Sequence, residues 1–103
     1  MDPKMFAEAM VNAAYNFPGE TAIRIDVGTF SAEQVRAIFD DVLASLATYK
    51  LRLRGVRTDW ASFAKLGIPQ DTVNSGLYSG IPVVLTASAD FDTMEFVFQP
   101  RSR

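Results

Sequence analysis

The sequence predicts an α+β fold, built as a single two-layer sandwich whose sheet keeps one open polar face. Two observations indicate this. Segments with apolar residues at helical spacing alternate along the chain with segments in which every second residue is apolar. Each strand-like segment also carries polar residues between its apolar ones. Helices would therefore cover one side of the sheet and leave the other to water or to a partner. The expected order is α-β-α-β-α, then a loop or a short helix over 67–80, then β-β.

The first helix and the first strand occupy the beginning of the chain. Asp2 before Pro3 is typical of an N-cap followed by the first helical position. Pro18 and Gly19 would end this helix, and Thr21 to Val27 alternates as a strand does when one of its faces is buried. The apolar residues at helical spacing are Phe6, Ala9, Met10, Ala13 and Phe17.

The second helix begins with a capping box, in which Ser31 is followed three residues later by Gln34. Tyr49 to Arg57 then alternates as a second strand, with Leu51 and Leu53 on one face. A strand, a helix and another strand in succession predict a right-handed parallel crossover. The apolar residues of this helix are Val35, Ile38, Phe39, Val42, Leu43 and Leu46.

The remaining part of the chain supplies a short helix and two more strands. Thr58 would cap the short helix, and Gly67 would end it in the left-handed conformation. Two β-rich runs, Ile81 to Thr86 and Thr93 to Gln99, would then pair as a hairpin.

Composition restricts the classes of function. The chain contains no Cys and no His, which removes the usual zinc sites, thiolate chemistry and Ser-His-Asp catalysis. No other catalytic constellation is visible, so we expect a protein that is not an enzyme and that uses no metal and no cofactor.

Length and charge add further expectations. We expect residues 1–103 to form one domain with a flexible tail over 100–103. The first residues have neither a basic leader nor a long apolar run, so the expected location is the reducing cytoplasm, away from membranes. A formal net charge of −2 gives no overall attraction to nucleic acid.

The second predicted strand carries a basic cluster. Lys50, Arg52 and Arg54 share one predicted strand face, and Arg57 lies just beyond them. Such a cluster could bind phosphate, but no aromatic residue stands beside it to stack on bases. The alternative is a solvated face whose cations lie opposite Asp26 or Glu95 across the sheet, and we favour it.

Residues 59–100 resemble a DNA-binding motif. "KLGIPQDTVNSGLYSG" (65–80) places a glycine at a turn before Val73 and Leu77, and two β-rich runs follow. In this order the segment resembles the helix-turn-helix and β-hairpin of the phage Cro type of repressor, which implies a homodimer that reads two half-sites. The resemblance also implies a recognition helix. The DNA-binding residues would then be Gln70, Asp71, Asn74 and Ser75, which would face the bases, and Lys65, which would contact phosphate.

The charges of this segment disfavour DNA. No Lys or Arg lies between Lys65 and Pro100. Phosphate neutralisation supplies much of the affinity for duplex DNA, so a DNA-binding protein is the alternative here rather than the leading hypothesis. The acidic residues of the segment are Asp71, Asp90, Asp92 and Glu95.

The connection from Gly67 to Gly80 favours binding to a protein. Connections of this length are often binding elements, and Leu77 and Tyr78, with Asn74 nearby, would offer an exposed contact. Our leading hypothesis is a small non-enzymatic protein-binding module that acts, as an inhibitor would, by occupying a surface on a host or virion protein. Its phage or mobile-element origin rests on the Cro resemblance. A virion structural component is a further alternative, with Met94 to Gln99 as an exposed hairpin edge.

Overall fold

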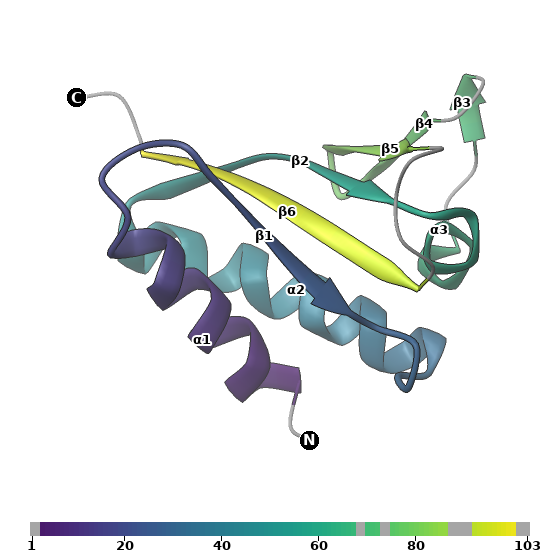
Figure 1. Cartoon of the computed structure of the whole chain (residues 1–103), viewed down its shortest axis with the longest axis horizontal. Helices are drawn as coiled ribbons and strands as arrows, with labels where there is room; N and C mark the ends of the chain where they lie inside the picture. The colour runs from purple at the N-terminus through teal and green to yellow at the C-terminus, as the bar shows by residue number, and fades with distance from the viewer. Residues whose placement is uncertain (1–2, 68–69, 73–74, 87–91, 101–103) are drawn as a thin grey trace.

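The computed structural model describes residues 3–67, 70–72, 75–86 and 92–100, which form an α+β fold (Figure 1). The helices in these ranges are α1 (Pro3–Tyr15), α2 (Ala32–Tyr49) and α3 (Trp60–Leu66). The strands are β1 (Thr21–Asp26), β2 (Leu51–Thr58), β3 (Gln70–Thr72), β4 (Ser75–Tyr78), β5 (Ile81–Leu85) and β6 (Thr93–Pro100).

The strands form one mixed sheet in the order β1-β6-β2-β5-β4-β3. β6 lies between β1 and β2 and is antiparallel to both, so β1 and β2 run parallel without being neighbours (Figure 1). β5 pairs in parallel with β2, and β4 and β3 extend the sheet in antiparallel pairing. The parallel direction expected of β1 and β2 is therefore present, with another strand inserted between them.

Local capping explains where α2 begins and ends. The predicted capping box is confirmed, because the backbone N–H of Gln34 donates to Ser31 Oγ at 3.1 Å and that of Ser31 donates to Gln34 Oε1 at 2.9 Å. At the other end, Lys50 adopts the left-handed conformation (φ 54°) and terminates the helix. Tyr49 and Lys50 therefore precede β2. The alternation in the sequence predicts them as part of the strand, which is wrong.

The caps of α3 are partly as expected. Gly67 ends the helix in the left-handed conformation, with φ 68°. The N-cap, however, is Asp59 and not Thr58, since the backbone N–H of Ser62 donates to Asp59 Oδ1 at 3.3 Å. Thr58 is fully buried at the end of β2, where its hydroxyl donates to the carbonyl of Thr93.

The prediction of a loop or short helix over 67–80 is wrong for the described residues of that segment. They form β3 and β4, and β4 is joined to β5 by a two-residue turn at Ser79 and Gly80. Both turn residues have positive φ, 49° and 82°, which matches the right-handed twist of a hairpin.

The predicted pairing of β5 with β6 is also wrong. β2 lies between them, so the two strands occupy the same sheet without touching as a hairpin. β6 is consequently an inner strand and not an exposed edge. Pro100, which we assigned to a terminal tail, is the last residue of β6, and residues 101–103 lie outside the described part of the chain.

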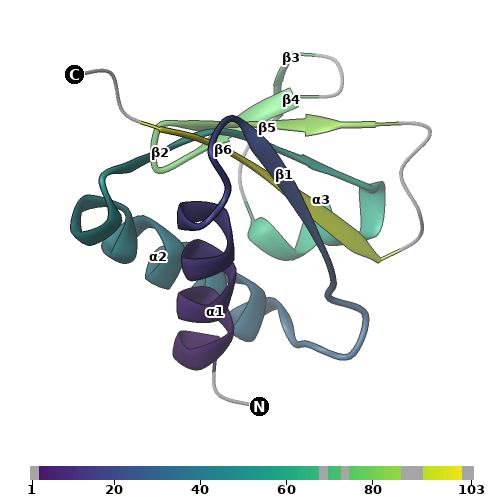
Figure 2. The same ribbon diagram turned by 60° about the vertical axis from the view of Figure 1, so that its left-hand side comes forward.

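α1 and α2 cover one face of the sheet, as Figures 1 and 2 show. The core lies between these layers and is rich in fully buried aromatic and branched side chains. Its largest members are Phe39, Phe96, Phe98, Ile38, Leu66 and Met94. α3 packs against α2 at the end of β2, where Arg36 Nη1 donates to the carbonyl of Lys65 at 3.0 Å. The two-layer architecture is thus confirmed.

Candidate binding site on the open sheet face

The sheet face opposite α1 and α2 is not covered by any described element (Figure 2). The burial pattern alternates along the strands, so one set of side chains is buried under the helices and the other set is outward. The outward set mixes charged and apolar residues. Its most exposed members are Ala22, Arg24, Asp26, Arg52, Arg54, Arg57, Leu77, Pro82 and Val84.

A β-bulge in β2 brings three arginines to this face. The pairing of β2 with β6 shifts between Leu53 and Gly55, and the alternation of buried residues changes phase there. Arg52 lies before the shift, Arg54 lies within it and Arg57 lies after it, yet all three are exposed. Lys50, the fourth residue of the predicted cluster, is exposed at the end of α2 and does not belong to the strand.

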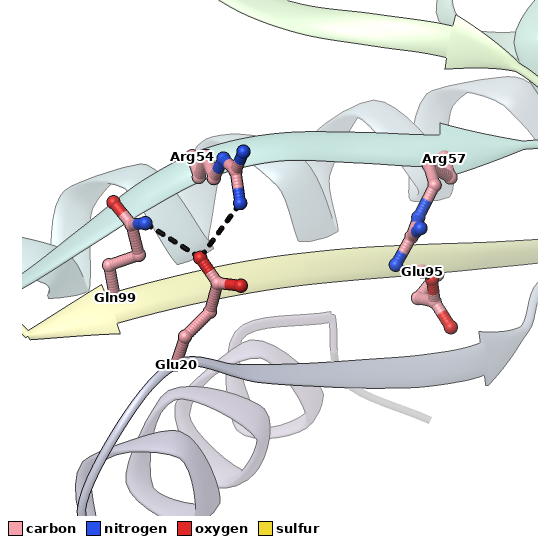
Figure 3. Close-up of polar contacts among 5 residues, drawn as sticks. All are labelled: Glu20, Arg54, Arg57, Glu95 and Gln99. Carbon is pink, nitrogen blue, oxygen red and sulfur yellow. Dashed lines mark hydrogen bonds and ion pairs between the residues drawn. The ribbon is translucent and has the colours of Figure 1, made fainter.

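Arg54 is held by a carboxylate from the segment that precedes β1. Its Nη1 lies 2.9 Å from Glu20 Oε1, and Gln99 Nε2 donates to the same oxygen at 2.6 Å (Figure 3). The hydrogen bond from Gln99, followed by that from Arg54, lowers the pKa of Glu20 below its ordinary value. Glu20 therefore stays ionised at neutral pH and closes one side of the site.

Arg57 is paired across the sheet with Glu95 of β6. The two side chains form an ion pair of 2.5 Å, and their backbones are in register (Figure 3). This confirms our expectation of a cation opposite Glu95, whereas Asp26 accepts a hydrogen bond from the backbone N–H of Gly28. Arg24 of β1 is in register with Glu95 on the side away from Arg57. Arg24 also interacts with another group of the chain.

A shallow pocket of about 300 Å³ lies between these two ion pairs. Arg54, Arg57 and Glu20 stand around it, and Gly55 and Val97 contribute to its floor. Gly55 has little room for a side chain, because a Cβ there would come within 3.3 Å of the carbonyl oxygen of Pro82. The pocket therefore offers donors, one acceptor side chain and a small apolar surface within one concave region.

Apolar side chains continue the site toward β4. Val84 is in register with Arg57 and is 41% exposed, and Leu77, 50% exposed, is paired with Pro82. Leu77 and Val84 are diagonal neighbours on adjacent strands, so they form one patch. We call the pocket together with Leu77, Pro82 and Val84 the open-face site.

Of the two predicted loop contacts that the structure describes, Leu77 lies on this face and Tyr78 does not. Tyr78, the next residue of β4, points toward the helices, where its ring packs 4.5 Å from that of Phe39 and its hydroxyl donates to Asp40 Oδ1 at 2.9 Å. Burial and then the hydrogen bond to Asp40 raise the pKa of Tyr78 to about 12. Tyr78 is thus a structural residue and not an exposed contact, and Asn74 lies outside the described residues.

The described residues that were expected on a recognition helix lie on strands instead. Gln70 and Asp71 belong to β3 and Ser75 to β4, while Asn74 lies outside the described residues. Lys65 donates from Nζ to the carbonyls of Val27 and Phe30, at 2.9 and 3.0 Å. Because the segment is extended and this lysine ties α3 to the loop after β1, the helix-turn-helix geometry that motivated DNA binding is absent from the described chain.

Sequence reasoning missed Glu20, Val84 and Val97. Glu20 precedes its strand and so has no periodicity to identify it, and its role depends on β6 being next to β1. Val84 could have been found, because alternation within Ile81 to Thr86 places it on the face opposite to Val83. Val97 required the strand order.

The described residues hold no group of three or more acidic, His or Cys side chains able to bind a metal ion. None of their helices is long and apolar enough to cross a membrane. Compared with protein-family models, curated proteins and solved structures, the chain gives no match.

Proposed function

We propose that the protein is a small non-enzymatic protein-binding module that docks its partner on the open-face site. The observation that carries this proposal is the exposure of Leu77 and Val84 beside the Arg57–Glu95 pair, on a sheet face that no described element covers. Protein interfaces combine such an apolar centre with a polar and charged rim, and arginine is enriched in them.

The titratable groups support binding over catalysis. Among the described residues, the groups whose pKa is shifted are Glu20, Asp59 and Tyr78. In each case the pKa shift is caused in part by hydrogen bonds that join elements of the fold or that border the open-face site. Phage origin and a role as an inhibitor remain predictions from the sequence, and no described feature of the fold supports them.

Affinity capture with matched variants tests the proposal. Leu77→Arg and Val84→Arg each place a long cation in the apolar patch, whereas Ala44→Arg places the same residue on the exposed side of α2. The tagged protein and the three variants would be exposed to a lysate of cells that produce the chain.

We expect a partner that the unaltered chain and Ala44→Arg retain to be lost with both patch variants. In a titration with that purified partner, each patch variant should weaken the dissociation constant by about tenfold or more, as loss of an interface anchor does. Recovery of the same proteins at the same yield by all four chains would refute the open-face site as the docking surface. Equal unfolding midpoints would show that the comparison is made between folded chains.

A further inference from the structure

The two edges of the sheet are protected to very different extents. β3 ends one side with only three residues, and its pairing with β4 is interrupted by a register shift. β1 ends the other side with six residues, contains no proline and pairs with β6 without any shift. Short, bulged edges resist further pairing, whereas a regular edge accepts another strand.

The hydrogen-bond ladder shows which backbone groups of β1 point outward. The N–H of Val27 donates to the carbonyl of Asp92 at 2.8 Å, continuing the register in which Asp26 faces Thr93. Because hydrogen-bonding residues alternate along an antiparallel strand, Ile23 and Ile25 also face β6. The backbone groups of Ala22, Arg24 and Asp26 therefore point toward the outer edge.

We propose that β1 pairs with β1 of a second copy of the chain, antiparallel and centred on Ile25, to form a two-fold dimer with a continuous sheet. Side chains opposite each other must lie on the same face, so the registers available to two such strands differ in steps of two residues. Centring on Ile25 places Arg24 of each copy opposite Asp26 of the other, which gives two identical ion pairs.

The neighbouring registers are less favourable. Centring on Arg24 would set the two Arg24 side chains against each other, and centring on Asp26 would set the two Asp26 side chains against each other. Centring on Ile23, one step further, would set Asp26 against Glu20. Arg24 already interacts within its own chain and lies beside Glu95. A guanidinium has five N–H donors, so Asp26 of the second copy would join this network.

The layer below the sheet is compatible with the same arrangement. α1 lies under β1, so two copies related by this axis bring their α1 helices toward each other (Figure 1). Met5 of α1 is 68% exposed. A second copy therefore fits this edge by backbone direction and by charge.

Charge reversal tests the register. We would measure mass by sedimentation equilibrium over a series of protein concentrations for the unaltered chain, Arg24→Glu, Asp26→Lys and an equimolar mixture of the two variants. The unaltered chain should reach twice 11.4 kDa. Each variant alone should remain at 11.4 kDa, because each reversal creates two repulsive pairs.

The mixture, read together with the unaltered chain, tests this register, because registers centred on Arg24 or on Asp26 would set like charges against each other in the unaltered chain. Within the register centred on Ile25, self-pairing of either variant still sets like charges against each other at both contacts. A mixed dimer instead joins opposite charges at both contacts, so the mixture should return to the double mass. As controls, Arg52→Glu on the inner strand β2 and Leu77→Arg in the open-face site should both remain dimeric. Because Leu77→Arg should weaken docking at the open-face site and leave the dimer unchanged, it separates failure of the dimer from failure of the proposed function.

An unaltered chain that stays monomeric at all concentrations would overturn the proposal, as would dimers of Arg24→Glu or masses above a dimer. Asp26→Lys also removes the hydrogen bond from the backbone of Gly28 and could fail to fold. Amide hydrogen exchange of the unaltered chain covers that case, since the N–H groups of Arg24 and Asp26 should become more protected as concentration rises. Unchanged exchange at both positions would contradict the pairing.

Discussion

Neighbouring residues of β6 experience two different environments. Phe96 and Phe98 are fully buried on the face that the helices cover, while Glu95 and Val97 are half-buried on the open face. One face of β6 thus contributes to the core, and its other face presents side chains that a partner could contact. Substitutions on the first face should cost stability, and substitutions on the second should cost binding.

The largest difference is expected between Phe96 and Val97. Phe96→Ala should lower the free energy of unfolding by about 3 to 5 kcal/mol, because the ring packs 5.4 Å from that of Phe39 and its loss leaves a cavity. Val97→Ala should cost about 1 kcal/mol or less, since the residue is only half-buried. Urea titrations of the two variants measure both values, and equal losses would mean that the two faces do not differ.

Leu77 and Tyr78 sharpen the comparison within β4. Tyr78→Ala should cost about 2 kcal/mol, because it removes the ring from Phe39 and the hydrogen bond to Asp40. Leu77→Ala should change stability by less than about 0.5 kcal/mol, as surface substitutions usually do. If thermal unfolding ranked Leu77→Ala as the more harmful change, the assignment of these residues to opposite faces would be wrong.

Titration of Tyr78 should add an alkaline dependence. Its pKa is about 12 in the folded protein and 10.0 unperturbed, so its contribution to stability is complete below pH 10 and lost as the pH rises toward 12. Tyr78→Phe keeps the ring and should lose this part of the dependence. Unfolding free energies measured between pH 9 and about 12 should therefore fall less steeply in Tyr78→Phe. Identical slopes would count against the burial of Tyr78 and its hydrogen bond to Asp40.

Asp59, on the side of the sheet that the helices cover, should have a smaller effect on the free energy of unfolding. Burial opposes its ionisation, but hydrogen bonds from Ser62 and from the backbone N–H of Asp92 outweigh burial and hold its pKa below 3.8. Its contribution is present above pH 3.8 and is lost as the pH falls through the folded-state value. Asp59→Ala should cost about 1 to 2 kcal/mol at neutral pH, as loss of an N-cap does. The variant should also show a shallower acid dependence than the unaltered chain.

The smallest effect is expected from the ion pairs of the open face. Arg57→Ala should change stability by less than about 1 kcal/mol, because its side chain is 52% exposed and water screens the pair with Glu95. Double-mutant cycles with Glu95→Ala at low and high salt measure the coupling. A large coupling that salt does not reduce would show that this face stabilises the fold.

Elements with local signals could be predicted from the sequence. The capping box at Ser31 and the left-handed Gly67 depend on residues within one helical turn, and both are present. The β4–β5 hairpin also has a local signal, because Ser79 and Gly80 lie between Tyr78 and Ile81, two residues of high β propensity. We assigned that segment to a helix or loop because Val73 and Leu77 are four residues apart.

Strand order and the open-face site could not be predicted in the same way. The pairing of Arg54 with Glu20 requires β6 to separate β1 from β2, and no short-range pattern specifies such an insertion. The bulge at Gly55 likewise depends on its partner strand, although it decides that Arg57 joins Arg54 on one face. Tyr78 looked available in the sequence because the strand that turns it inward was not recognised.

The position of β6 has a consequence for how the chain acquires its structure. β1 and β2 are made early, but β6, the strand that joins them, follows all the other elements that the structure describes. Pairings between segments so far apart slow folding, and sheets dominated by them form in about milliseconds to seconds. Until Thr93 and the residues after it leave the ribosome, β1 lacks β6, its pairing partner, and Phe39 of α2 lacks the ring of Phe96. The nascent chain should therefore depend on chaperones most strongly just before its last strand emerges.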